Sequence, residues 1–275
     1  MILSFAPAGS AGMLLAGSSL LALLAYGGAA MLAESASSRW RGLPALLLLG
    51  WLGHLLALTV DIAGLGLDLG GARFGFAPAL SMTMWLVVAV YLIESRLVPL
   101  PGARRVLAAL AALTVLVAWY FPGEARPQAA SPWAPLHWAL GLASYGLFGV
   151  AVLHAVMLSR AERLMRQKKP GLALGMPLLR LERLTFQFVG AGVALLSLAL
   201  LLGWWFTPQW RWDHKTLLSV LGWVVLTGLV TGRRLFGWRG RRATRWLYLG
   251  AALLLLGYAG SRFVLEVLLQ RSAGH

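Results

Sequence analysis

The chain alternates long runs of apolar residues with short polar connections from one end to the other. Most runs approach the ~20 residues that a helix needs to cross the hydrocarbon core of a bilayer. Because no water satisfies backbone groups in that core, such runs predict helices with internal hydrogen bonds. No Lys or Arg precedes the first run, which is also long for a signal peptide, so we expect it to be retained. We expect eight transmembrane helices, over residues 10–32, 43–65, 76–95, 106–121, 135–159, 184–206, 217–231 and 246–269.

Basic residues are concentrated in every second connection. Eighteen of the 24 Lys and Arg residues lie there, and only six lie elsewhere. Because cytoplasmic loops carry an excess of Lys and Arg, this pattern predicts that both termini are outside. The expected fold class is therefore all-α: a polytopic membrane helix bundle, N-out and C-out, forming a single integral-membrane domain over residues 1–275.

The composition agrees with a membrane protein. Hydrophobic residues make up 59% of the chain and charged residues 12%, whereas a soluble domain has about 25% charged residues. The formal charge of +15 follows from the basic loops, so we expect membrane lipid as a partner and no nucleic acid. Cysteine is absent, which excludes disulfides, thiolate metal sites and cysteine nucleophiles. No nucleophile–base set or metal-hydrolase spacing occurs, so we expect the chain not to be an enzyme.

Three ionisable residues fall at membrane depth, where such groups are costly and indicate function. His54 lies near the middle of the second run, and Asp61 follows two turns later on the same helix face. His154 lies in the fifth run, near its cytoplasmic end. Two neutral imidazoles from different helices can fill both axial positions of a haem iron, so His54 and His154 are a candidate inner pair. The alternative is that each is a hydrogen-bonded structural group.

The segment GWWFTPQWRWDHKT, residues 203–216, contains four of the 13 tryptophans of the chain. An interfacial belt of indoles at headgroup level is one explanation. A flat platform for a flat ligand is the other, because each indole offers a large apolar face. These tryptophans are Trp204, Trp205, Trp210 and Trp212.

Two further histidines, His137 and His214, lie at helix ends expected on the outer side. We expect them to form an outer pair of haem ligands. Arg211, Lys215 and Arg126 can neutralise two propionates, although snorkelling at the interface is the simpler explanation for Arg211 and Lys215 alone. Asp213 can orient an imidazole, as carboxylates do for metal-bound histidines.

These residues resemble a known family. The segment of about 178–234 is similar to the core of the cytochrome c assembly proteins, the haem-handling CcsA/CcmC type. It has their Leu-acidic-x-Leu entry, a long span ending in Gly and Trp, and a WxWDxK(E)T-like element, on whose positions stand Trp210, Trp212, Asp213, Lys215 and Thr216. Over the full chain, the eight runs and the stretches GRRLFGWRGRRA and GSRFVLEVLL look closest to the HemX/YpjD-like inner-membrane branch.

The resemblance implies b-type, non-covalent haem, bound at the outer face of a bacterial inner-membrane protein between histidines that flank the Trp-rich segment. It implies His137 and His214 as the outer ligands. In larger members a deeper pair passes haem upward, and His54 and His154 are the candidates here. Implied partners are haem and other cytochrome assembly or membrane-complex subunits. The resemblance leaves open whether this branch serves cytochrome c maturation, tetrapyrrole regulation or another membrane complex.

Two other functions stay open beside haem binding or presentation. The first is a transporter or ion-transport accessory subunit, in which Asp61, His54 and His154 form a polar path. The sequence shows no inverted repeat of the transporter kind, which counts against it. The second is a scaffold subunit whose tryptophans are only belt anchors.

Overall fold

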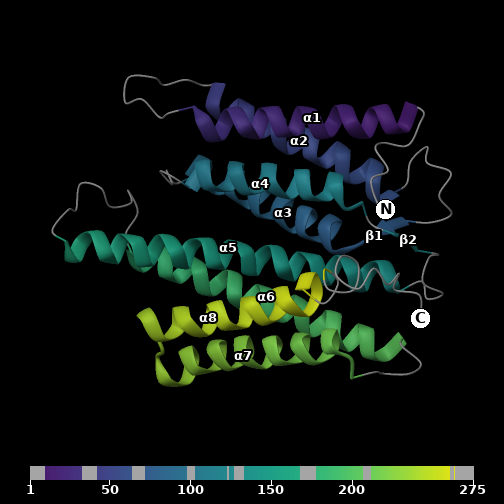
Figure 1. Ribbon diagram of the computed structural model, residues 1–275. Helices are drawn as coiled ribbons and strands as arrows, with labels where there is room; N and C mark the ends of the chain where they lie inside the picture. The colour runs from purple at the N-terminus through teal and green to yellow at the C-terminus, as the bar shows by residue number, and fades with distance from the viewer. Residues whose placement is uncertain are drawn as a thin grey trace. The chain divides into compact units, whose positions relative to one another are not determined.

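The computed structural model describes residues 10–32, 42–63, 72–97, 103–122, 124–126, 133–167, 178–206, 212–260 and 263. Eight α-helices account for most of these residues (Figure 1). The helices are α1 (Ser10–Met31), α2 (Gly42–Ala63), α3 (Phe76–Leu97), α4 (Ala103–Tyr120), α5 (Ala134–Arg166), α6 (Leu178–Phe206), α7 (His214–Phe236) and α8 (Gly240–Leu255), which continues into the π-helical turn η2 (Leu256–Gly260).

Each apolar run overlaps one of these helices, which confirms a helical membrane protein. Seven of the helices, α1 to α7, are long and apolar enough to cross a membrane. The eighth, α8, has 16 residues before the π-helical turn. Helices α5 and α6 extend past their apolar runs into the basic connection between them. A short antiparallel pair between β1 (Ala72–Phe74) and β2 (Glu124–Arg126) was not expected from the sequence.

The chain divides into two compact units, Met1–Ala129 and Ala130–His275. The single domain expected over residues 1–275 stays a prediction. In unit 1, α1 packs against α2 and α4, and α3 packs against α4 and α2. A small residue allows the close approach of α1 and α2, because a Cβ on Gly50 would lie 2.7 Å from Cδ1 of Tyr26.

In unit 2, α5 packs along α6, and α7 packs along α8. The core between them consists of apolar side chains from all four helices, including Phe148, Ala151, Val189, Leu196, Leu226, Leu229, Leu247 and Leu254. Helices α7 and α8 approach each other closely because each has a glycine that faces a leucine of the other helix. A Cβ on Gly222 of α7 would lie 2.8 Å from Leu254, and a Cβ on Gly250 of α8 would lie 2.5 Å from Leu226.

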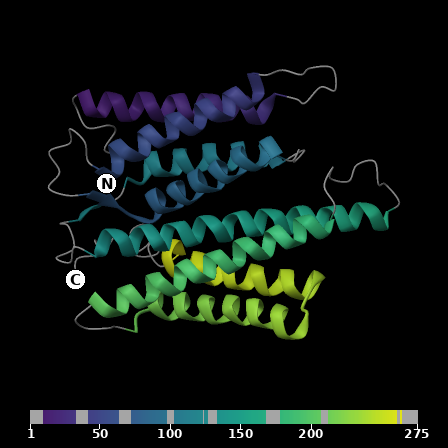
Figure 2. The same ribbon diagram turned by 180° about the vertical axis from the view of Figure 1, so that it is seen from behind.

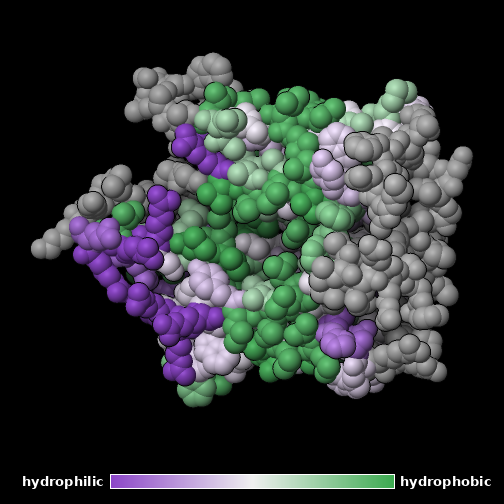
Figure 3. Space-filling model, in the orientation of Figure 1, coloured by the Kyte–Doolittle hydropathy of each residue, from purple (hydrophilic) through white to green (hydrophobic). Residues whose placement is uncertain are grey.

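Consecutive helices of unit 2 run in opposite directions, so their ends gather at two places (Figures 1 and 2). The starts of α5 and α7, the last turn of α6 and the turn η2 share one end, which we call the tryptophan end. The opposite ends of the same helices form the arginine end. Figure 3 shows strongly hydrophilic residues gathered at the arginine end, with hydrophobic residues covering the middle of the helices.

Candidate functional site

His137 is the best-positioned of the expected ligands. It lies in the first turn of α5, where its backbone N–H bonds the carbonyl of Trp133. Its Nδ1 lies 2.8 Å from the backbone oxygen of Ala199 on α6. A carbonyl oxygen can only accept a hydrogen bond, so Nδ1 carries the proton and donates it. The neutral ring then has its lone pair on Nε2, which is the tautomer of a histidine that binds a metal through Nε2.

Gly203 makes room for this imidazole. It lies one turn beyond Ala199 on the same face of α6 and is buried. A Cβ at position 203 would lie 2.8 Å from Cε1 of His137 and 3.1 Å from its Nδ1. The ring therefore occupies a notch that only glycine leaves open, and α6 determines both the position and the tautomer of His137.

Three of the four tryptophans of the Trp-rich segment can be placed. Trp204 and Trp205, in the last turn of α6, are 65% and 79% exposed, and Trp212, just before α7, is 63% exposed. These indoles therefore present apolar faces outward at the tryptophan end, as both the belt and the platform require. Trp210 and Arg211 lie outside the described residues.

The DHKT stretch forms the start of α7. Asp213 has an extended backbone, and its Oδ1 accepts a hydrogen bond of 2.7 Å from the backbone N–H of Thr216. The carboxylate is therefore an N-cap, and its expected role in orienting an imidazole stays a prediction. His214 is the first residue of the helix and is exposed. Nothing in the geometry of α7 constrains its imidazole as α6 constrains that of His137.

Lys215 turns back over the end of unit 2. Its Nζ lies 5.3 Å from the ring centroid of Tyr258 in the turn η2, within the range of a cation–π contact. It is also near enough for its positive charge to act on the imidazole of His137. The starts of α5 and α7 and the end of α8 are thus linked at the tryptophan end.

Two contacts of the half-buried Tyr145 support this arrangement, and neither could be predicted from the sequence. The ring of Tyr145 on α5 lies 6.3 Å from that of Tyr258, and its hydroxyl hydrogen-bonds Ser219 on α7. Nothing in the sequence pairs these residues, because they come from three separate segments. The sequence shows that Ala199 and Gly203 lie one helical turn apart. It does not show that a histidine of α5 fills the notch at Gly203.

His54 lies in unit 1 and is fully buried. Its Nδ1 lies 3.4 Å from the hydroxyl of Tyr26 on α1, and its Nε2 lies 2.7 Å from Oγ of Ser81 on α3. Both ring nitrogens are thus engaged with side chains of neighbouring helices. A cavity of about 30 Å³ adjoins the ring, and its polar lining also includes Ser19 and Asp61.

His154 lies in unit 2, on α5, and is also fully buried. Its ring meets that of Phe188 on α6 nearly edge-on, with centroids 5.4 Å apart. Because His54 and His154 belong to different units, their pairing stays a prediction. Within the described part of the chain, no group of three or more His, Asp or Glu side chains could hold a metal ion.

A family model described as "Cytochrome C assembly protein" matches residues 40–269, a range that includes parts of both units. Over 165 residues the chain is 32% identical to "Inner membrane protein YpjD" of Escherichia coli (strain K12), covering 58% of this chain and 63% of that protein. Over 151 residues it is 34% identical to an "Uncharacterized 28.8 kDa protein in nifR3-like 5'region" of Azospirillum brasilense, covering 52% and 56%.

A more distant relative carries a functional name. Over 223 residues the chain is 21% identical to "Cytochrome c biogenesis protein CcsA" of Prochlorococcus marinus, covering 68% of this chain and 71% of that protein. No solved structure shows a significant match.

The chain spans less than two thirds of the length of the Escherichia coli and Azospirillum brasilense proteins. The seven apolar helices and the name of the Escherichia coli relative agree on a multi-pass protein of the inner membrane. The matched range covers most of the sequence and confirms the resemblance first seen in the Trp-rich segment: the chain belongs to the cytochrome C assembly protein family.

Proposed function

We propose that this protein binds haem non-covalently at the tryptophan end of unit 2 and presents it during cytochrome c biogenesis. Membership of the cytochrome C assembly family supports a role in cytochrome c biogenesis. The relative from Prochlorococcus marinus is named for that process. The proposal is one of binding and presentation, with no catalytic residue assigned.

One observation carries the proposal: the hydrogen bond from Nδ1 of His137 to the carbonyl of Ala199. This bond directs the lone pair to Nε2 and restricts rotation of the ring, as outer hydrogen bonds do for metal-ligating histidines. The notch at Gly203 adds a steric restraint. An imidazole prepared in this way loses little conformational freedom when it binds iron.

The surroundings of His137 fit a haem in two further respects. The exposed indoles of Trp204, Trp205 and Trp212 offer apolar planes against which a porphyrin can stack. Lys215, held over Tyr258, supplies a positive charge for a propionate. We propose that His214 would also hold the iron, and its exposed position would let the side chain approach from the start of α7. When bound, haem would supply the iron that these imidazoles hold and that a partner apocytochrome receives.

The topology of the proposal follows from the distribution of charge. Eight membrane spans with both termini outside would place the arginine end in the cytoplasm and the tryptophan end on the outer side. The eighth is the span expected over residues 246–269, a range that includes most of α8 and the turn η2. Haem would be presented where cytochromes c are assembled outside the inner membrane, together with other assembly subunits.

The absorption spectrum of the purified protein tests this proposal. We expect a Soret band, either as isolated or after titration with haemin, that changes on reduction with dithionite. The His137→Ala and His214→Ala variants should each lose most of the band, while His275→Ala, outside both expected pairs, should keep it. An unchanged spectrum in the double variant of His137 and His214 would reject these ligands. Loss of residual absorbance in His54→Ala and His154→Ala would support the inner pair.

The cavity in unit 1 favours a second candidate function, a polar path for ion transport. Its volume of about 30 Å³ accommodates about one water molecule, and a carboxylate, an imidazole and two hydroxyls line it at membrane depth. This function predicts a transport defect in Asp61→Asn and no pigment in the purified protein. The absorption spectrum and a transport assay of Asp61→Asn therefore decide between haem binding and ion transport.

A further inference from the structure

An open groove lies between α6 and α7, at the arginine end of unit 2. Its volume of about 490 Å³ falls within the roughly 300–1,000 Å³ range of small-molecule sites. The residues that line it are Arg183, Phe186, Gln187, Gly190, Ala191, Val230, Arg233 and Arg234. None of them belongs to the proposed haem site, which lies at the opposite end of the same helices.

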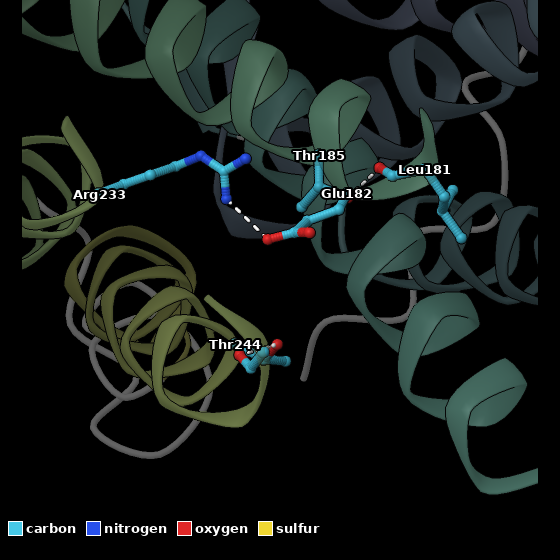
Figure 4. Close-up of polar contacts among 6 residues, drawn as sticks. Leu181, Glu182, Thr185, Arg233 and Thr244 are labelled. Atoms are coloured by element: carbon cyan, nitrogen blue, oxygen red, sulfur yellow. Dashed lines mark hydrogen bonds and ion pairs between the residues drawn. The ribbon is translucent and has the colours of Figure 1, made fainter. Parts of the chain in front are cut away.

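Charged groups surround the mouth of this groove. Arg183 on α6 and Arg234 on α7 are exposed there. Arg233 extends from α7 toward α6, where its Nη1 lies 2.9 Å from Oε1 of Glu182 (Figure 4). Its guanidinium also lies 3.7 Å from the ring centroid of Phe186. Because one of the three arginines is paired with the glutamate, these four residues leave a net charge of +2.

The rest of the lining is mostly apolar and comes from residues nearer the middle of α6 and α7. We call its apolar residues, Phe186, Gly190, Ala191 and Val230, the floor of the groove. Gly190 adds depth, because a Cβ placed there would meet nothing within 4 Å. A positively charged mouth above an apolar channel matches a ligand with an anionic head and a hydrocarbon tail.

We propose that the groove binds an anionic phospholipid. Its phosphate lies between Arg183 and Arg234, and one acyl chain lies along Gly190 and Val230. Arginine suits a phosphate because its planar guanidinium donates two parallel hydrogen bonds. The apolar floor favours a lipid over a free phosphate ion, which would leave that surface uncovered. The ion pair and the stacking on Phe186 hold Arg233 at the side of the site.

Lipid binding to the purified protein tests this site. Native mass spectrometry in detergent would follow titration with phosphatidylglycerol and with phosphatidylcholine of the same chain length. We expect a preference for phosphatidylglycerol, and a loss of affinity on the order of tenfold or more in Arg183→Gln/Arg234→Gln. The matched control is Arg241→Gln/Arg245→Gln, which removes the same charge from exposed positions of α8 and should leave binding unchanged.

A second variant tests the apolar floor without altering charge. Gly190→Leu fills open space and should weaken phosphatidylglycerol binding while the thermal unfolding temperature is kept. Equal losses in the two arginine pairs, or no preference between the two lipids, would overturn the proposal. Displacement of the lipid by millimolar inorganic phosphate would also overturn it, since the site would then hold a free anion. The haem spectrum should be unaffected in all these variants, so the two proposals fail separately.

Discussion

The imidazole of His137 occupies space that exists only because position 203 is a glycine. A Cβ at Gly203 would lie 2.8 Å from Cε1 of the ring, closer than real carbon atoms approach. The same helix supplies the carbonyl of Ala199 that accepts the proton on Nδ1. The packing of α6 against α5 therefore also orients the imidazole of His137 as a ligand.

Substitution of Gly203 should disturb the proposed haem site. In Gly203→Ala the added methyl group would push the ring of His137 away from Ala199 and release its orientation. We expect a weaker or shifted Soret band in titrations with haemin, because the lone pair on Nε2 would no longer be directed. Gly141→Ala on α5, where a Cβ meets nothing within 4 Å, is the matched control. A wild-type spectrum in Gly203→Ala would show that the notch has no part in binding.

Asp213 can be tested as a cap and as a partner of an imidazole separately. Its side chain accepts the N–H of Thr216 at the start of α7, so Asp213→Ala should lower the free energy of unfolding by about 1 kcal/mol. Asp213→Ser keeps a capping oxygen but no charge. We expect this variant to retain the unfolding temperature, so its haem spectrum reports on the charge alone. A weaker Soret band at unchanged stability would support a carboxylate that orients an imidazole, and a wild-type band would show that Asp213 acts only as a cap.

The α7–α8 contact depends on two glycines that face leucines of the opposite helix. Gly222→Ala and Gly250→Ala would force Leu254 and Leu226 out of their positions, at a cost of about 1–3 kcal/mol for overpacking a core. Thermal unfolding in detergent measures the effect. Gly228→Ala, also on α7 but facing open space, should be neutral or stabilising by about 0.5–1 kcal/mol. Equal unfolding temperatures for all three variants would contradict this packing.

Unit 1 contains a reciprocal tryptophan pair that joins α2 and α3. The rings of Trp51 and Trp85 stack with centroids 4.8 Å apart. Each indole N–H donates to the backbone carbonyl of the other residue, at 3.2 Å in both directions.

Replacing either residue with phenylalanine removes one of these hydrogen bonds and keeps an aromatic ring. We expect Trp51→Phe and Trp85→Phe each to lower the free energy of unfolding by about 1 kcal/mol. Because the residues touch, the double variant should depart from additivity by about 0.5 kcal/mol or more. Additive losses in a double-mutant cycle would count against a coupled pair. Trp205→Phe, at a 79% exposed position, should leave stability unchanged.

Much of the fold could be predicted from the sequence, because it depends on local chemistry. An apolar run in lipid must satisfy its own backbone, so the eight runs indicated eight helices. The alternation of basic connections indicated that the arginines of unit 2 gather at one end. Alternation of helix direction then brings the starts of α5 and α7 to the opposite end, where His137 and the Trp-rich segment lie. The pair of strands could not be predicted, because two three-residue segments are too short to show an alternation of apolar and polar residues.

Only the tertiary structure decided which side chains meet. Hydropathy does not reveal which face of a membrane helix points inward, since lipid and protein interior are both apolar and small residues mark the contacts only weakly. The rotation of α6 directs Ala199 and Gly203 toward His137, and the rotation of α2 directs His54 toward Tyr26 and Ser81. Hydrogen bonds and close contacts act over a few ångströms, and only packed helices define distances of that size.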